Sequence, residues 1–556
     1  MLNKTIKHIA IILVGLVLIN SISQNLYKRF DLTADKRYTL SESAVNIIED
    51  LDSPIVIDVF LEGEDFPSEF RRLQNETRQL LEEFSAENKN IVFSFINPLE
   101  DASNRERNIQ QLTERGLTPM QLSVQEHGKS SNAVIFPWAL ASYKEQTVII
   151  PLVKNKIGAS QQELVSNSVQ HLEYAFADGF SKLINPKSKK IAILKGNRQL
   201  EDIYIADFVK KLGAYYYIAP FTLDSVSNNP QKVLRDISNF DLIISAKPTE
   251  AFSEAEKLVL DQYTMQGGKS LWMIDAVAME KDSLYNANGM NVAIQRDLNL
   301  TDFFFKYGVR VNPSIVSTLY SAPITLAMGE GSQAQFQHLQ WPYSPLAGSN
   351  KNHPIVNNLN LVKFDFANQM DTLKNAVKKT ILLESAPLSK LEGTPREINL
   401  ELVTKPQDPQ SFNKGNQTLG VLLEGTFPSA YANRIKPFKL AQGLDKSVPT
   451  KMIVIADGDI IKNDVLRGKP QELGFDRWTG QVYGNKEFLL NAVNYLLDDN
   501  GLINIRSKEI AIAFLNQQKI ADEKTKWQLI NILLPLLLLA IFGFTFNSFR
   551  KKKYAA

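Results

Sequence analysis

The chain contains no cysteine, and this absence excludes disulfides, CxxC redox chemistry, thiolate zinc sites and a cysteine nucleophile. Histidine is scarce as well. The five histidines are His8, His127, His171, His338 and His353, and none of them is paired at the spacing of a metal site. We therefore expect neither a metal nor a cofactor.

Motifs of catalysis are missing too. No Gly-x-Ser-x-Gly nucleophile elbow occurs. The stretch Gly267-Gly268-Lys269-Ser270 lacks the first glycine of a phosphate-binding loop, because Tyr263 occupies that position. We interpret it as the glycine end of a helix. Asp457-Gly458-Asp459 begins like a calcium loop, but Ile461 fills the third ligand position. The sequence therefore predicts a protein that is not an enzyme.

Charge of neither sign dominates, but its distribution is uneven. Lysine and arginine total 62 against 60 aspartates and glutamates, for a net charge of +2. Both ends of the chain are purely basic, so the middle is slightly acidic and nucleic acid is excluded as a partner. The basic residues of the two tails are Lys4, Lys7, Arg550, Lys551, Lys552 and Lys553.

Two long apolar runs stand near the ends, at residues 8–22 and 529–546. A membrane-spanning helix needs ~20 apolar residues, so the second run is long enough and the first is slightly short. We expect both to lie in lipid. Their candidate membrane anchors are Ile9, Leu13, Leu16 and Leu18 in the first run, and Leu533, Pro535, Leu537 and Phe542 in the second.

The first run also fits a cleaved signal peptide that ends at Ser21-Ile22-Ser23. An uncleaved anchor is favoured because Tyr27, Lys28 and Arg29 form an interfacial belt directly after it. Four cationic residues after the second run hold the C-terminus in the cytoplasm, and two spans then hold the N-terminus there. Either interpretation exports the middle of the chain.

The exported middle has an α/β pattern in two parts. The first part reads β-α-β-α-β-β, the order of a thioredoxin-like fold. In the second, continuous apolar strands alternate with amphipathic helices, which indicates a parallel sheet covered on both faces, with a β-rich insertion. The strand at 452–461 is expected to join this sheet late.

These patterns divide the chain into six segments. They are an N-terminal tail and first span at 1–30, a thioredoxin-like domain at 31–185, an α/β domain at 186–505 with an insertion at about 278–449, a linker at 506–528, a second span at 529–549 and a basic tail at 550–556.

Polar residues follow several predicted strands, where α/β sheets place their ligands. We expect them to line a crevice that binds a ligand or partner, although a turn at a strand end is the simpler interpretation of Asp457 and Asp459. Trp341 and Tyr343, in a proline-rich stretch, could stack on a sugar or a partner chain, whereas packing of a long loop is the favoured alternative. The candidate crevice residues are Asn197, Asp275, Asp457, Asp459, Trp341, Tyr343 and His353.

Four stretches spread over the chain resemble the gliding-motility-associated ABC transporter family GldG of Bacteroidota, usually described as substrate-binding or accessory components. They are RFDLTADKRYTLSESAVNII (Arg29 to Ile48), FDLIISAKPTEAFSEAEKLVLDQYTMQGGKSLWMID (Phe240 to Asp275), WPYSPL (Trp341 to Leu346) with HPI (His353 to Ile355), and VLLEGTFPS (Val421 to Ser429).

This resemblance implies a polytopic ABC permease and a cytoplasmic ATPase as partners, besides membrane lipid and other gliding or secretion proteins of the envelope. It implies two copies per complex as one option, the bacterial inner membrane as location, and a periplasmic position for the main domains. It also implies that the α/β unit is similar to glutamine amidotransferases. Their nucleophile is a cysteine, which this chain lacks.

We therefore expect a non-enzymatic subunit that couples movement of the permease and ATPase to periplasmic partners or substrate. The alternative is a membrane-anchored envelope receptor that binds a carbohydrate or peptide without any transporter.

Overall fold

A computed structural model describes residues 12, 14–16, 31, 33, 36–63, 66–101, 103–126, 129–329, 334–349, 352–498, 501–508 and 517–554. Residues 1–509 belong to one unit and residues 510–556 to a second. The predicted anchors Ile9, Leu13 and Leu18 and the basic residues Lys4 and Lys7 lie outside the described residues. Leu16 is helical and exposed.

A four-stranded sheet organises the N-terminal part of the first unit, with the order β2-β1-β5-β6. Strands β1 and β2 are parallel, and the other pairs are antiparallel. In β1 the side chains of Ile55, Ile57 and Val59 alternate with exposed ones and are buried, so that only one face is apolar. Its strands are β1 (Ile55–Val59), β2 (Ile91–Phe95), β5 (Trp138–Tyr143) and β6 (Gln146–Pro151).

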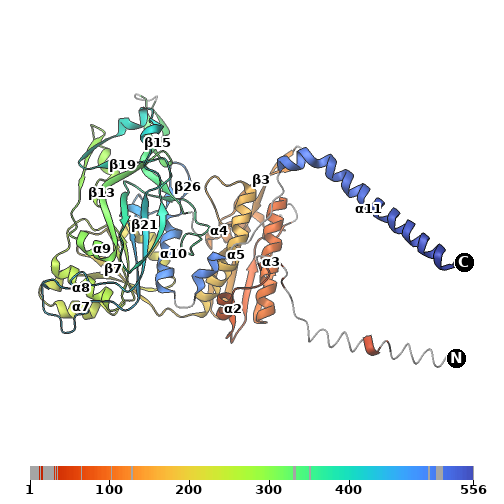
Figure 1. Ribbon diagram of the computed structural model, residues 1–556, viewed down its shortest axis with the longest axis horizontal. Coiled ribbons are helices and arrows are strands. Elements are labelled where there is room, and N and C mark those ends of the chain that lie inside the picture. The colour runs from red at the N-terminus through yellow and green to blue at the C-terminus, as the bar shows by residue number, and fades with distance from the viewer. Residues whose placement is uncertain are drawn as a thin grey trace. The chain divides into compact units, whose positions relative to one another are not determined.

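Two long helices cover that apolar face and lie side by side (Figure 1). They are α3 (Ser68–Glu87) and α5 (Gln161–Ile184), and the rings of Phe84 and Phe180 meet edge-on between them at 5.1 Å. A capping box formed by Ser160 and Glu163 begins α5. The remaining elements of this part are α2 (Glu42–Ile48), α4 (Arg105–Glu114) and the hairpin of β3 (Met120–Glu126) and β4 (Lys129–Ile135).

A seven-stranded sheet forms the second part, with the order β18-β21-β22-β10-β9-β7-β8. The five strands from β22 to β8 are parallel, whereas β21 is antiparallel to both of its neighbours, β22 and β18. The predicted late strand is confirmed, because β22 pairs with β10. The strands are β7 (Lys190–Lys195), β8 (Tyr217–Thr222), β9 (Leu242–Ala246), β10 (Lys269–Met273), β18 (Lys378–Glu384), β21 (Thr418–Gly425) and β22 (Thr450–Ile455).

Helices cover both faces of this sheet, and every residue of β9 is buried, as expected of a central parallel strand. Helices α6 (Asp202–Leu212) and α10 (Asn485–Leu497) pack on one face. Helices α7 (Pro230–Ile237), α8 (Glu254–Met265) and α9 (Thr301–Tyr307) pack on the other. Gly267, at φ +96°, ends α8 as predicted, and β10 follows it.

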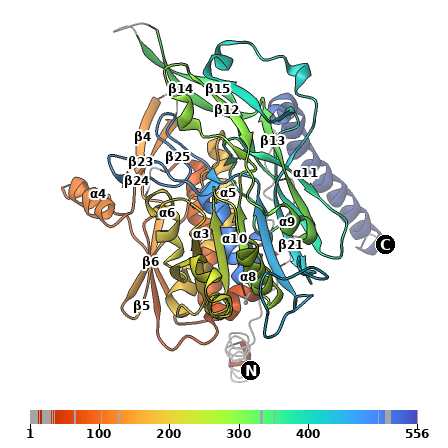
Figure 2. The ribbon, with the colours of Figure 1, turned by 90° about the vertical axis from the view of Figure 1, so that its left-hand side faces the viewer.

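The predicted insertion does not stay apart from this sheet, because β18 and β21 both fall within 278–449. Their apolar runs are buried on two faces, so they complete the sheet rather than a separate layer. The rest of the segment forms three small sheets, grouped at one end of the unit (Figure 2). Their strands are β11 (Val277–Ala278), β12 (Met290–Gln295), β20 (Arg396–Asn399), β13 (Val309–Thr318), β17 (Asn368–Thr372), β19 (Ser389–Gly393), β14 (Ser321–Met328), β15 (Gln335–Ala347) and β16 (Val362–Lys363).

Two short hairpins follow β22 in the chain. They are formed by β23 (Val465–Leu466) with β24 (Lys469–Pro470), and by β25 (Phe475–Asp476) with β26 (Gln481–Val482).

The second unit contains one long helix, α11 (Gln517–Tyr554), with Pro535 inside it. Within the described residues, Asp522–Tyr554 is the one helical stretch long and apolar enough to cross a membrane. The helix begins earlier than the predicted span at 529, because the polar residues before it are good helix formers and need no lipid. Leu533, Leu537 and Phe542 are exposed on its surface.

Candidate functional site

Charged side chains follow three neighbouring strands of the seven-stranded sheet. Lys247 comes after β9, Asp275 after β10, and Asp457 and Asp459 after β22. Because β9, β10 and β22 are parallel neighbours, their carboxyl ends meet at one edge of the sheet. Lys247 has a φ of +53°, which is uncommon for a residue with a Cβ atom. The structure therefore brings Asp275, Asp457 and Asp459, three of the predicted crevice residues, together around a lysine that the sequence reasoning missed.

The ammonium of Lys247 is the centre of this strand-end cluster. It lies 2.6 Å from Asp459 Oδ2, 2.7 Å from Glu280 Oε2 and 3.7 Å from Asp275 Oδ2, while the residue itself is only 2% exposed. Burial alone would lower the pKa of Lys247, but the three carboxylates outweigh burial and raise that pKa above its ordinary value. Lys247 is therefore held as a cation.

Two buried carboxyl groups fix the turn after β22. The Gly458 amide donates to Asp275 Oδ1 at 2.5 Å, and the Asp459 amide donates to Asp457 Oδ1 at 2.6 Å. The Asp365 amide donates to the other oxygen of Asp457 at 2.7 Å. Burial raises the pKa of both Asp275 and Asp457. These two side chains organise backbone, so the simpler interpretation of Asp457, a turn at a strand end, describes what it does here.

The cluster has the ligands of a cation site, but a cation of the protein already occupies it. Carboxylate oxygens of Asp275, Glu280 and Asp459 lie within 4.8 Å of one another, close enough to bind one metal ion. The ammonium of Lys247 lies among these oxygens at hydrogen-bonding distance from two of them. A metal ion would have to displace a buried lysine, so this arrangement supports a structural role for the charges.

The other predicted crevice residues do not join this cluster. Asn197 follows β7, where its amide donates to Gln199 Oε1 at 2.9 Å and its carbonyl accepts from the Thr249 amide at 3.0 Å. His353 lies against the ring of Tyr495 of α10, with centroids 4.9 Å apart. Both therefore contribute to local packing.

Trp341 and Tyr343 are buried in the small-sheet region, where their rings pack on each other at 5.3 Å. Tyr343 also stacks on Phe366 at 5.6 Å, and its hydroxyl donates to Glu392 Oε2 at 2.9 Å. The proline-rich stretch is not the long loop that we predicted but strand β15, which tolerates proline because its pairing with β14 is irregular between Gln340 and Pro345. Packing, the favoured alternative, is what these two rings do.

A cavity of about 530 Å³ opens next to the strand-end cluster. It is bounded by the turn after β22, by β14, by the short helix Lys281–Leu284 and by the β23–β24 and β25–β26 hairpins. Glu280 and Asp459 of the cluster reach its wall. No local pattern predicted this cavity, because its walls come from five separate stretches of chain.

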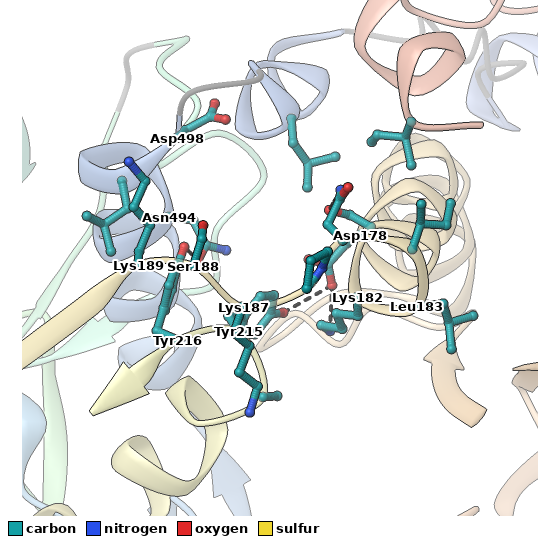
Figure 3. A pocket seen from close by; sticks show the side chains of 18 of the residues that line it. Asp178, Lys182, Leu183, Lys187, Ser188, Lys189, Tyr215, Tyr216, Asn494 and Asp498 are labelled. Atoms are coloured by element: carbon teal, nitrogen blue, oxygen red, sulfur yellow. Dashed lines mark hydrogen bonds and ion pairs between the residues drawn. The ribbon is translucent and has the colours of Figure 1, made fainter. Parts of the chain in front are cut away.

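A second cavity, of about 540 Å³, lies between the N-terminal part and the α/β part of the first unit (Figure 3). Several of its polar groups are paired with one another. Asp178 Oδ2 lies 2.7 Å from Lys182 Nζ and accepts from the Tyr215 hydroxyl at 3.1 Å. The predicted domain boundary at Asn185-Pro186-Lys187-Ser188 lines this cavity, so the cavity marks the joint between the two parts.

A buried ion-pair network crosses the same joint. Glu487 of α10 accepts from Lys154 and from Arg506, both at 2.7 Å through the same Oε1 atom. Burial lowers the pKa of Lys154 to about 8, which leaves it charged at neutral pH. Burial would raise the pKa of Glu487, but Lys154 and Arg506 outweigh it and lower that pKa to about 2. The same cations and burial keep His171 neutral, since its pKa is lowered well below the ordinary value.

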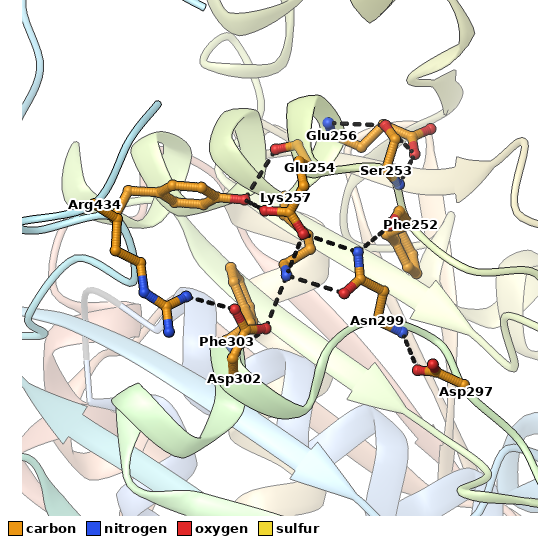
Figure 4. Close-up of polar contacts among 11 residues, drawn as sticks. Phe252, Ser253, Glu254, Glu256, Lys257, Asp297, Asn299, Asp302, Phe303 and Arg434 are labelled. Carbon is orange, nitrogen blue, oxygen red and sulfur yellow. Dashed lines mark hydrogen bonds and ion pairs between the residues drawn. The ribbon is translucent and has the colours of Figure 1, made fainter. Parts of the chain in front are cut away.

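A further network stabilises the beginning of α8 (Figure 4). The buried Lys257 ammonium lies 3.0 Å from Glu254 Oε1 and 2.8 Å from Asp302 Oδ1. Arg434 reaches the other oxygen of Asp302 at 2.6 Å, and the Tyr431 hydroxyl donates to Glu254 at 2.7 Å. These contacts join α8, α9 and the segment after β21, and we assign them a structural role.

Comparisons with known proteins match almost the whole chain. A family model described as "ABC-type uncharacterized transport system" matches residues 188–492, and a model described as a domain of unknown function matches residues 34–142. An uncharacterized protein of Borreliella burgdorferi is 20% identical over 533 residues, which cover 94% of this chain and 93% of that protein. Among solved structures, the mmIFT52 N-terminal domain covers 56% of this chain and 98% of its own, at 13% identity and a TM-score of 0.31.

Proposed function

The chain belongs to the family described as "ABC-type uncharacterized transport system", an auxiliary family of ABC transporters, and on that premise we propose that it couples a permease and an ATPase to the far side of the membrane. The family match over residues 188–492 carries the proposal. In it, the folded unit is non-enzymatic, lies in the periplasm and moves with the transporter. We further propose that the transporter serves gliding motility and lies in the cell envelope of Bacteroidota.

The apolar helix α11 supports attachment to a membrane. Its apolar surface is exposed along the described helix, and lipid or other membrane helices would cover it. Lys551, Lys552 and Lys553 in its last turn favour a cytoplasmic C-terminus. The periplasmic orientation, the second span near the N-terminus and the permease as a neighbour of both spans follow as proposals.

The second support is where the folded unit connects to the two ends of the chain. The Lys508 ammonium donates to the carbonyl of Thr39 at 2.7 Å and lies 2.6 Å from Glu173 Oε2. Glu173 Oε1 in turn accepts from the Ser41 amide at 2.7 Å. The carboxylate of Glu173 on α5 therefore contacts both Ser41, which follows the predicted first span, and Lys508, which precedes α11. Movement of either span would act on the same point of the folded unit.

The third support is the joint between the two parts of that unit. Glu487, on a helix of the α/β part, is paired with Lys154, which follows β6 of the N-terminal part. The Lys154 amide also donates to Ser168 Oγ of α5 at 2.9 Å. A displacement applied to α5 would therefore be passed to α10 through this contact and the Lys154–Glu487 pair, and not only through the chain connection at 185–189.

Fold comparisons remain part of the proposal. The strand order β2-β1-β5-β6, with one parallel and two antiparallel pairs, supports a thioredoxin-like N-terminal domain. The five parallel strands between helices support an amidotransferase-like α/β domain. Without cysteine, both would serve in binding and not in catalysis. The mutual neutralisation of charges around Lys247 is consistent with that.

Co-purification of the full-length chain tests the partnership. Detergent extracts should yield the chain together with a permease and an ATPase, and recovery of the chain alone, under conditions that keep other transporters assembled, would contradict it. Alkaline carbonate should leave the chain in vesicles. Protease outside spheroplasts should digest the folded unit, whereas protection of that unit would contradict the orientation.

The coupling route has its own test. In the purified complex, ATP should change hydrogen exchange in α5 and α10, and Glu173→Gln should diminish that change without preventing co-purification. Asp241→Asn removes an exposed contact, with Lys189 at 3.8 Å, and serves as the control. An undiminished ATP response in Glu173→Gln would contradict the shared attachment point.

A further inference from the structure

We propose that the cavity beside the strand-end cluster binds a neutral carbohydrate. The inference stands apart from the proposed coupling role, since it requires no transporter. The cavity lies at the carboxyl ends of parallel strands, where α/β proteins bind their ligands, and its volume of about 530 Å³ falls in the usual range of small-ligand pockets.

Aromatic side chains are the first reason for this ligand class. Tyr285 and Trp478 both line the cavity, and they are 55% and 45% exposed. Trp478 keeps this exposure although Phe336 lies 5.0 Å and the Arg477 guanidinium 4.9 Å from its ring. Exposed rings in the wall of a cavity provide apolar platforms, which suit the apolar faces of sugar rings.

The contact between Phe336 and Trp478 also shows how the cavity is built. Phe336 belongs to β15 and Trp478 to the turn between β25 and β26, so the β14–β15 hairpin is held over the short hairpins. Figure 2 shows β25 between that hairpin and helix α6. Residues of β14, β25 and α6 all line the cavity.

The polar groups of the cavity fit hydroxyl groups better than they fit ions. Lys363 and Asp365 face each other at 3.4 Å, and Lys462 lies 3.7 Å from Asp282. Lys247 pairs with Glu280 and Asp459, so six of the ten charged lining residues are paired locally. Neither a strongly anionic nor a strongly cationic ligand would find an unbalanced field of opposite sign. Such groups can donate and accept hydrogen bonds with a polyhydroxylated molecule.

A buried hydroxyl group also supports a polyhydroxylated ligand. The hydroxyl of Tyr483, a residue 3% exposed that lines the cavity, is buried without a hydrogen-bond partner among the described residues. Buried hydroxyls are normally satisfied, and a bound ligand or its water could supply the partner.

Calorimetric titration of the full-length chain with a panel of neutral hexasaccharides tests the proposal. The panel contains maltohexaose, cellohexaose, chitohexaose and mannohexaose, and the detergent must carry no sugar headgroup. We expect saturable binding of at least one member. Replacing one stacking ring should weaken it about tenfold, so Tyr285→Ala and Trp478→Ala are the test variants.

Tyr217→Ala is the matched control, because Tyr217 is 56% exposed but lies on β8, away from the cavity. It should bind as the unmodified chain does, and Trp478→Tyr, which keeps a ring, should retain most of the affinity. Unchanged thermal unfolding would show that the variants are folded. Absence of binding to the whole panel, binding that neither test variant weakens, or displacement of the sugar by mixed-sequence peptides at lower concentration would each overturn the proposal.

Discussion

Replacing Glu487 with glutamine removes the carboxylate that Lys154 and Arg506 share at the joint of the folded unit. The amide keeps the size of the side chain but not its charge. Two cations would then face each other in a buried place with no counter-ion. Removing one partner of a buried ion pair usually costs about 3–5 kcal/mol, and the 31% exposure of the Glu487 side chain places the expected loss near the lower end.

A matched control is available on the same helix. Lys486 pairs with Glu472 at 2.7 Å, the distance found between Lys154 and Glu487, but the Glu472 side chain is 53% exposed. Glu472→Gln should therefore cost less than about 1 kcal/mol. Urea denaturation of the purified chain, followed by tryptophan fluorescence, measures both losses. Amide hydrogen exchange should become faster in β6 and α5 of the Glu487→Gln variant, because the joint opens, and should stay unchanged in Glu472→Gln.

A second substitution tests the physical reason. Lys154→Met in the Glu487→Gln background removes one of the two uncompensated cations, so it should restore part of the lost stability. Equal losses for Glu487→Gln and Glu472→Gln would refute the argument that burial sets the cost. So would a double variant less stable than Glu487→Gln alone.

Three further outcomes follow from the charged networks. Lys247→Met should lower the free energy of unfolding by about 3 kcal/mol, since it removes the central cation of three carboxylates, which keep only contacts of 3.8 Å with Arg296 and Lys462. Calcium at a hundredfold excess over its Kd should then return about 2.7 kcal/mol, with no effect on the unmodified chain; calcium-insensitive unfolding would contradict this. Lys257→Met should lower the free energy of unfolding by about 2 kcal/mol, whereas Arg198→Ala, at an exposed ion pair, should lower it by less than about 0.5 kcal/mol. Equal unfolding midpoints for these two variants would contradict a structural role for the network at the beginning of α8. The folded-state pKa of Glu487 is lowered to about 2 from an ordinary 4.5, so the ionised carboxylate stabilises the fold by about 3 kcal/mol. This stabilisation is present above pH 4.5 and is lost as the pH falls towards 2. The urea midpoint, measured over this pH range, should show the loss in the unmodified chain and not in Glu487→Gln.

Local patterns predicted the elements well where one physical cause dominated. The apolar strand predicted at 452–461 overlaps β22, and the apolar run at 529–546 lies within α11. In each case burial or lipid determines the conformation from neighbouring residues alone. The conformation of the proline-rich stretch around Trp341 was predicted wrongly, because proline indicates a loop unless an irregularity in the strand pairing removes the need for its amide.

The candidate site was predictable only in part. Asp275 and Asp457 were found because each follows an apolar strand, and the same position could have identified Lys247. Glu280 and Trp478 could not be found, because they reach the site through turns and hairpins that have no period. Their neighbours are determined by contacts between distant segments, which no local window contains.

The contact between Thr39 and Lys508 also has a consequence for moving the folded unit into another protein. A folded body whose first and last residues are neighbours can be spliced into a host chain at a single site without stretching the host. The unit between those two residues should therefore fold when grafted into the loop of an unrelated membrane hairpin. A transporter could therefore gain or lose this unit as one inserted domain.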